Sequence, residues 1–208
     1  DLGFYFWRSG SGVSDYELQR LESTGSNVLY LRITDLVWDQ NSSSIEATGL
    51  IPSFPEVPES IEIIPVVYIQ HQCFIQNIEA NQLSEMLCAT LEQYQGFDRV
   101  NEIQIDCDWT KGSKEKYFEF LKALKLESGK DLSVTIRLHQ TKYPEQTGVP
   151  PADRGMLMFY NMSNLNDPEI ENFIFHPETA QAYLVDFSSY PIPLDVALAI
   201  YSQGVLIR

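Results

Sequence analysis

The sequence predicts an α/β fold and, within that class, a compact (β/α)8 TIM barrel whose late helices are short or missing. Strand-like apolar runs alternate with amphipathic stretches, an order that favours a parallel sheet because parallel neighbours need a crossover connection. Eight such runs suggest that the sheet closes on itself. The 208 residues, 44% of them hydrophobic, suit one core, so we expect a single domain over residues 1–208.

The predicted strands are short apolar runs bounded by polar turns. The first five are Gly3–Arg8, Asn27–Ile33, Ile61–Ile69, Asn101–Asp108 and Asp131–His139, and three shorter ones follow at Gly155–Asn161, Ala182–Ser188 and Gly204–Arg208. An open doubly wound sheet is the alternative. It favours longer helices and a GxGxxG first turn, and the Gly10-Ser11-Gly12 turn lacks that spacing.

The predicted helices lie between these runs. Ser14 and Glu17 form a capping-box pattern that opens a helix to about Ser23. Apolar residues at helical spacing predict further helices over Leu83–Tyr94, Ser113–Leu126 and Leu194–Tyr201. The connection at Pro177–Gln181 has room for no more than a turn or two of helix.

The charge of the chain restricts its partners. A formal net charge of -15 repels phosphate backbones and anionic lipid, so we expect no nucleic-acid partner and an easier fit for a neutral or cationic ligand. No apolar run reaches the roughly 20 residues of a membrane helix, and no basic, leucine-rich leader opens the chain. A final GVLIR strand would expose its outer face, so an additional C-terminal segment or domain is expected to cover it.

The sequence predicts neither a metal site nor a cofactor. Cys73, Cys88 and Cys107 lack zinc-type spacing, and Cys88 and Cys107 are expected to be buried free thiols inside a helix and a strand. No HExxH pair, nucleophile elbow or P-loop is present.

The fourth predicted strand carries the residues of greatest chemical interest. Alternate side chains of a strand share a face, so Gln104, Asp106 and Asp108 point one way, while Ile103 and its apolar partners point toward the helices. The two aspartates would then face the barrel axis near the C-terminal end of the strand, where active sites of this fold are built.

The same alternation places other polar and aromatic side chains beside the two aspartates. Arg32 and Thr34 would share a face of the second strand, and Trp7 and Tyr190 are further aromatic residues near strand ends. The candidate substrate-binding residues are Arg8, Arg32, Asp35, Trp38, Tyr68, Gln104, Trp109, Arg137, His139, Tyr160 and Asp186. The structural alternative is that these charged side chains form a salt-bridge network that only fills the barrel interior. Packed hydrophobic residues often fill such an interior without loss of stability, so the charges there call for another reason.

Two carboxylates beside aromatic rings fit glycoside cleavage, with Asp106 and Asp108 acting as general acid and as base or nucleophile. Carboxyl separations of about 5 Å and about 6.5–9.5 Å distinguish retaining from inverting enzymes. Residues two apart on a strand have Cα atoms roughly 6.6 Å apart, so either outcome stays open.

The runs FYFWR, VLYLRITDLVWD, IPVVYI, QIDCDWT and LSVTIRL resemble the glycoside-hydrolase-like (β/α)8 barrels, and most closely a bacterial family of unknown function within them. The fourth strand is more distantly similar to the DxDxE motif of chitinase-like barrels. Gln104 takes the first Asp position, Asp106 the second and Asp108 that of the catalytic Glu. The neutral Gln104 and the shorter Asp108 depart from the pattern and argue against substrate-assisted chemistry.

The resemblance implies a carbohydrate ligand and export to the periplasm or cell surface. The first functional hypothesis is a glycoside hydrolase that uses the Asp106–Asp108 pair. The alternative is a catalytically degenerate barrel that binds a glycan or a protein partner without cleavage.

Overall fold

A computed structural model describes residues 1–8, 12–76, 78–163, 172–184 and 189–201. The fold is α/β with a parallel sheet, as predicted. The chain divides into two compact units, unit 1 (Asp1–Val134 with Pro150–Ala152) and unit 2 (Thr135–Val149 with Asp153–Arg208). No described helix has the length and apolar composition needed to cross a membrane.

The sheet of unit 1 contains the first five predicted strands in the predicted order. They are β1 (Gly3–Phe6), β2 (Val28–Asp39), β4 (Glu62–Ile69), β5 (Glu102–Asp106) and the first part of β6 (Asp131–Arg137). β1 pairs with β2, β2 with β4, β4 with β5 and β5 with β6, and every one of these pairs is parallel. Each strand ends within two residues of its predicted end, except β2, which continues six residues beyond Ile33.

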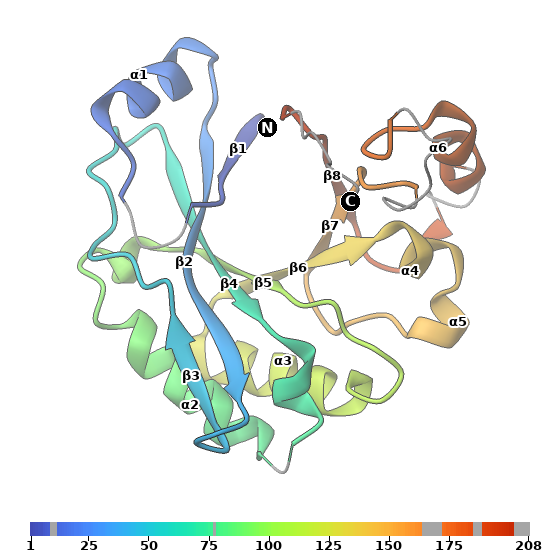
Figure 1. Cartoon of the computed structure of the whole chain (residues 1–208). Helices are drawn as coiled ribbons and strands as arrows, with labels where there is room; N and C mark the ends of the chain where they lie inside the picture. Colours follow the sequence, from blue (N-terminus) through green and yellow to red (C-terminus); the bar gives the residue numbers. More distant parts are fainter. Residues whose placement is uncertain (9–11, 77, 164–171, 185–188, 202–208) are drawn as a thin grey trace. The chain divides into compact units, whose positions relative to one another are not determined.

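The sheet of unit 1 is curled (Figure 1). β2 and β4 separate β1 from β5, so a flat sheet would hold β1 and β5 about 14 Å apart. Yet the Tyr5 hydroxyl on β1 donates a hydrogen bond of 2.5 Å to the Gln104 amide oxygen on β5. The two side chains meet because the sheet curves around them, in the manner of half a barrel. Closure into a full (β/α)8 barrel and a single domain over 1–208 stay predictions.

Two helices carry the apolar layer of unit 1, and they pack against each other (Figure 1). They are α2 (Ala80–Leu91) and α3 (Lys114–Ser128). α2 begins and ends three residues before its predicted bounds, and Gly129 ends α3 in the left-handed conformation expected of a glycine stop. Tyr117, Phe120 and Leu121 on α3 are fully buried, so the apolar spacing of this helix faces the core.

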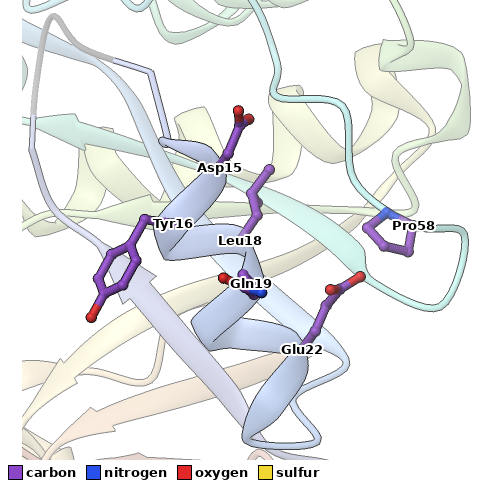
Figure 2. Close-up of a pocket in the computed structure, with 6 residues that line it drawn as sticks. All are labelled: Asp15, Tyr16, Leu18, Gln19, Glu22 and Pro58. Atoms are coloured by element: carbon purple, nitrogen blue, oxygen red, sulfur yellow. The ribbon is translucent and has the colours of Figure 1, made fainter.

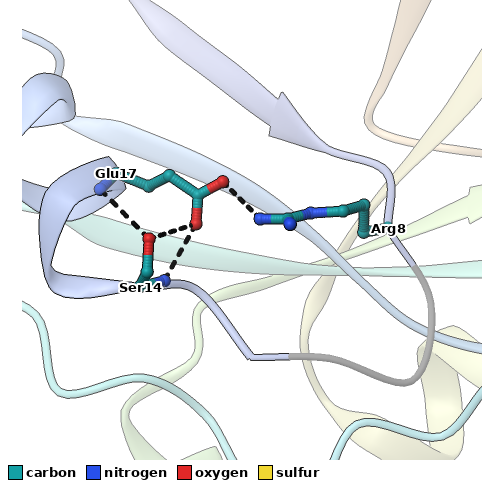
Figure 3. A network of polar contacts seen from close by, with 3 residues as sticks. All are labelled: Arg8, Ser14 and Glu17. Carbon is teal, nitrogen blue, oxygen red and sulfur yellow. Dashed lines mark hydrogen bonds and ion pairs between the residues drawn. The ribbon is translucent and has the colours of Figure 1, made fainter.

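The first helix, α1 (Asp15–Ser23), begins as the sequence predicts (Figure 3). The Ser14 hydroxyl accepts from the Glu17 backbone N–H at 3.4 Å, and the Ser14 backbone N–H donates to the Glu17 carboxylate at 2.9 Å. Arg8 forms an ion pair with the same carboxylate. Two backbone donors at the start of α1 are thereby satisfied.

An antiparallel hairpin extends β2. The added strand, β3 (Ser44–Thr48), pairs with the second half of β2, from Asp35 opposite Thr48 to Asp39 opposite Ser44. The turn is closed by Asp39, whose carboxylate accepts from the backbone N–H groups of Asn41 and Ser42. The sequence does not predict this strand, because SIEAT is only five residues long and has no run of apolar residues. Two short 3-10 helices, η1 (His71–Phe74) and η2 (Phe97–Arg99), follow β4 and α2.

Unit 2 holds the end of β6 and the elements after it. These are α4 (Leu138–Lys142), α5 (Pro144–Thr147), β7 (Arg154–Met158), α6 (Pro177–Leu184) and β8 (Leu194–Ala197). β8 pairs with β7 in parallel, from Gly155 opposite Leu194 to Met158 opposite Ala197. Gly155 lies in a tight place, because a Cβ there would come within 2.7 Å of Ile136 and of Leu194.

Three predictions for unit 2 are wrong. His139 lies in α4 and not on a strand, because β6 ends at Arg137. The predicted helix over Leu194–Tyr201 begins with β8, and the alternating apolar residues from Leu194 to Ile200 are the period-two signal that should have indicated a strand. Residues 182–184, predicted to begin a strand, end α6. The remainder of that strand and the Gly204–Arg208 strand lie outside the described residues.

Candidate functional site

The alternation predicted for β5 is present. Ile103 and Ile105 are fully buried, and Gln104 between them accepts from Tyr5 and donates to the Ser133 hydroxyl at 3.0 Å. Side chains from strands as far apart as β1 and β5 can meet only on the concave face of the curled sheet. Gln104 and, two residues later, Asp106 therefore project from β5 onto this concave face.

Asp106 lies in a row of polar side chains across three strands. Its backbone is in register with Tyr68 on β4, and Tyr68 is in register with Asp35 on β2. The Arg32 guanidinium donates two hydrogen bonds to Asp35, at 2.7 Å and 2.5 Å, and lies 5.6 Å from the centre of the Tyr68 ring. The row places one cation and three acidic or phenolic groups on the concave face of unit 1.

The charges of this row are coupled. Hydrogen bonding to Asp35 raises the pKa of Arg32, burial opposes that rise, and the negative charges of Asp35 and then Asp106 add to it. Because the guanidinium already donates two bonds to Asp35, the charge of Arg32 is largely neutralised within its own strand.

A β-bulge in β2 determines which residue lies on the same face as Arg32. The pairing with β4 shifts between Arg32 and Thr34, so one extra residue is accommodated there. The prediction that Thr34 shares the face of Arg32 is therefore wrong. Thr34 is fully buried and donates to the Thr48 carbonyl at 3.1 Å, while Asp35 takes the place beside the guanidinium.

Asp108 lies two residues beyond the end of β5 and is exposed, whereas Asp106 is only 8% exposed. Both carboxylates influence Tyr68: burial raises the pKa of its phenol, and the charges of Asp108 and Asp106 raise it further. The Tyr68 hydroxyl thus stays protonated at neutral pH. Cys107 between them is buried, and burial holds the pKa of its thiol well above its ordinary value.

Some predicted site residues of unit 1 lie elsewhere. Trp109 is 5% exposed and its ring packs against Tyr117 and Phe118 of α3. Arg8 is paired with Glu17 in front of α1. Trp38 follows Asp35 by three residues on the hairpin, so alternation turns it to the opposite face of β2.

The predicted site residues of unit 2 are Arg137, His139, Tyr160 and Asp186. Arg137 is half-buried at the end of β6, and His139 is exposed on α4. The Tyr160 hydroxyl donates to the Met158 sulfur at 3.2 Å. Asp186 lies outside the described residues. How these side chains relate to the row in unit 1 stays a prediction.

An aromatic stack on β1 and β2 is the feature that the sequence analysis missed. The Tyr5 ring lies between Trp7, at 4.7 Å and 2° between planes, and Tyr30, at 4.5 Å and 21°. Trp7 was noted only as an aromatic residue near a strand end. The available signal was the spacing of Tyr5 and Trp7, which are two positions apart and so share a face.

Two surface hollows of unit 1 contain none of the candidate side chains. One lies on α1, between the helix and Pro58, and has Asp15, Tyr16 and Glu22 among its lining residues (Figure 2). The other is lined by residues of the 53–63 and 95–101 segments, where β4 and β5 begin. Among the described residues, no group of three His, Cys, Asp or Glu side chains is arranged to hold a metal ion.

The three cysteines are free and buried, as expected for Cys88 and Cys107. Burial raises the pKa of Cys73 and of Cys88 to about 11. Since the thiolate is the reactive form, burial disfavours nucleophilic chemistry at these thiols.

Comparison with known proteins supports the fold. No family model matches the chain, and no curated protein matches it. A solved structure similar to it is the C-terminal domain of a putative chitinase from Desulfitobacterium hafniense DCB-2, with a TM-score of 0.55 and 10% sequence identity. The match covers 93% of this chain and 64% of that chain. This similarity is one of fold and agrees with the predicted resemblance to chitinase-like barrels.

Proposed function

We propose that this protein is a carbohydrate-active glycoside hydrolase whose carboxylate pair is Asp106 and Asp108. The observation that carries the proposal is the register that sets Tyr68 on β4 beside Asp106 at the end of β5. The charges of Asp108 and Asp106 both raise the pKa of the Tyr68 phenol. Two acids at the end of a parallel strand, with a hydrogen-bond donor on the neighbouring strand, are groups that glycosidic cleavage can use.

The environments of the two acids suggest a division of roles. Asp108 is exposed beyond the strand end, where it can reach a glycosidic oxygen or a water molecule. Asp106 is buried, and its charge acts on Arg32. In our proposal Asp108 exchanges the proton, and Asp106 acts as the second carboxylate, which stabilises positive charge on the sugar ring or activates water.

The surrounding row would position the substrate. Tyr68, protonated at neutral pH, can donate a hydrogen bond to a sugar oxygen or to one of the acids. The Arg32–Asp35 ion pair would fix the side chains at the β2 end of this row. We propose that Arg137, His139, Tyr160 and Asp186 also contact the substrate.

A glycan-binding barrel without catalysis is the second candidate, and Gln104 favours it. This residue takes the first acidic position of the chitinase-like motif, yet it is fully buried and hydrogen-bonded on both sides. A neutral amide held in this way cannot relay a proton along the strand. A hydrolase of this type would therefore depend on Asp106 and Asp108 alone.

The test is a panel of neutral and acidic oligosaccharides incubated with the wild type, Asp108→Asn and Asp106→Asn. Asp98→Asn, an exposed aspartate of η2, is the matched control. We expect cleavage by the wild type and the control, and a fall in kcat of about 10²–10⁴ in each site variant with a nearly unchanged KM. Binding without cleavage in all four proteins would favour the second candidate, and neither binding nor cleavage would refute both.

We further propose that the protein is exported to the periplasm or cell surface, and that an additional C-terminal segment or domain covers exposed apolar residues in and just after β8. Val196, Leu198 and Ile200 are all exposed, which is the observation behind the second part. Fractionation of cells that express the complete gene tests the location, because a wholly intracellular protein would contradict export.

A further inference from the structure

The stack of Trp7, Tyr5 and Tyr30 is a rigid support for its outermost ring. Tyr30 is 7% exposed and fixed in the core, and the Tyr5 hydroxyl is held by Gln104. Trp7 lies parallel to Tyr5 and is only half-buried. Within the part of the chain that the structure describes, no second ring lies against Trp7. One face of the indole thus packs on Tyr5, and the other has no aromatic neighbour among the described residues.

Trp7 stands at the level of Asp106 on the concave face. The hydrogen bond from Tyr5 to Gln104 ties β1 to β5 at one level. Trp7 follows Tyr5 by two residues, just past the end of β1, and Asp106 follows Gln104 by two residues on β5, which runs the same way. Both residues therefore lie about 6.6 Å further toward the C-terminal edge, on the face that carries the carboxylates.

The charges around this face select for a neutral ligand. Arg32 donates two hydrogen bonds to Asp35, and Arg8, next to Trp7, is paired with Glu17. Both arginines of unit 1 that lie near the stack are already matched by carboxylates. An anionic sugar would meet Asp106 and Asp108 without a compensating cation from these two arginines.

We propose that Trp7 is the stacking platform for a neutral pyranose ring beside Asp106, and that the protein discriminates against acidic and sulfated sugars. This inference rests on the proposed carbohydrate function and adds to it the substrate class and the residue that binds the ring face. A gluco-configured pyranose suits the platform, because its equatorial hydroxyls leave flat C–H faces for the indole, while its edge hydroxyls can reach the carboxylates.

The first test measures binding by calorimetry to hexasaccharides of β-1,4-linked glucose and N-acetylglucosamine and to oligogalacturonate. The proteins are the wild type, Trp7→Leu, Trp7→Phe, and Tyr16→Ala as a control that removes an exposed ring on α1. We expect a neutral hexasaccharide to bind, Trp7→Leu to raise its Kd about tenfold or more, and Trp7→Phe to raise it less. Tyr16→Ala should bind like the wild type.

The outcomes separate this inference from the proposed function. Neutral glycan binding that Trp7→Leu leaves unchanged overturns the platform while the carbohydrate function stands. Tighter binding of oligogalacturonate than of either neutral sugar overturns the selectivity. Failure of the wild type to bind any glycan overturns both proposals.

A second measurement needs no variant. Oxidation of the wild type with N-bromosuccinimide, followed by peptide mass spectrometry, reports the accessibility of each indole. A saturating neutral hexasaccharide should protect Trp7 and leave the oxidation of Trp38 unchanged. Equal oxidation of Trp7 with and without sugar would contradict the platform, whatever the stability of the Trp7 variants.

Discussion

Replacing Gln104 by methionine should destabilise the curled sheet of unit 1. Gln104 is fully buried, and it accepts from Tyr5 at 2.5 Å and donates to Ser133 at 3.0 Å. Methionine conserves the volume but keeps neither strong hydrogen-bonding group. The change therefore removes one buried and one partly buried hydrogen bond, which together join three strands.

The expected loss follows from those two bonds. Each contributes about 1 kcal/mol, and the loss of the amide partner for the buried Ser133 hydroxyl adds about 1–2 kcal/mol in desolvation. The total is about 3–4 kcal/mol. For a chain of this length, each kcal/mol lowers Tm by about 2–4 °C, so Tm should fall by about 6–16 °C.

Urea unfolding followed by circular dichroism measures the effect. Gln19→Met on the exposed surface of α1 is the matched control and should stay within about 0.5 kcal/mol of the wild type. Tyr5→Phe removes one of the two bonds and should cost about 1–2 kcal/mol, and combining it with Gln104→Met should add less than that cost. A Gln104→Met variant as stable as the control would refute the claim that these bonds hold the sheet in its curl.

Three further predictions concern other parts of the chain. Gly155→Ala should destabilise unit 2 by about 1–3 kcal/mol, since the new methyl would lie 2.7 Å from side chains on both sides; an unchanged Tm would contradict this close packing. Ser14→Ala should lower the free energy of unfolding in urea by about 1 kcal/mol, because the hydrogen bond from the Glu17 N–H is lost. Ser14→Asp should keep most of the wild-type stability. Equal stability of all three proteins would argue against the cap. The thiols of Cys73 and Cys88 have pKa values raised to about 11, so the stability that they confer is complete below pH 8.5 and is lost as the pH rises toward 11. Urea midpoints from pH 7 to 10.5 should fall less in a variant with both cysteines changed to alanine.

The carboxylate position was predictable from sequence because it depends on a short-range rule. Period-two alternation assigns Gln104 and Asp106 to one face and Ile103 to the other without knowledge of any neighbour. The same rule was inadequate for Asp108 and His139, because both lie beyond the ends of their strands. Strand ends depend on where pairing with neighbouring strands stops, which a single sequence does not state.

The bulge in β2 shows a second limit. Alternation pairs Arg32 with Thr34, but one extra residue at Ile33 reverses the faces and puts Asp35 beside the guanidinium. Nothing in LRITD indicates the bulge. Its consequence is large, because Arg32, predicted as a substrate-binding residue, becomes half of an ion pair within its own strand.

The sequence by itself determined the α/β class, the order of the five parallel strands of unit 1, the cap of α1 and the face of β5 that carries Gln104 and Asp106. These features follow from local periodicity and from the chemistry of residues close together in the chain. Only the tertiary structure decided that Tyr5 meets Gln104, that Trp7 stacks on Tyr5, and that Asp35 accepts the hydrogen bonds of the Arg32 guanidinium. Such contacts join residues on different strands or across a bulge, and they depend on the curl and register of the sheet, which arise from the packing of all its strands together.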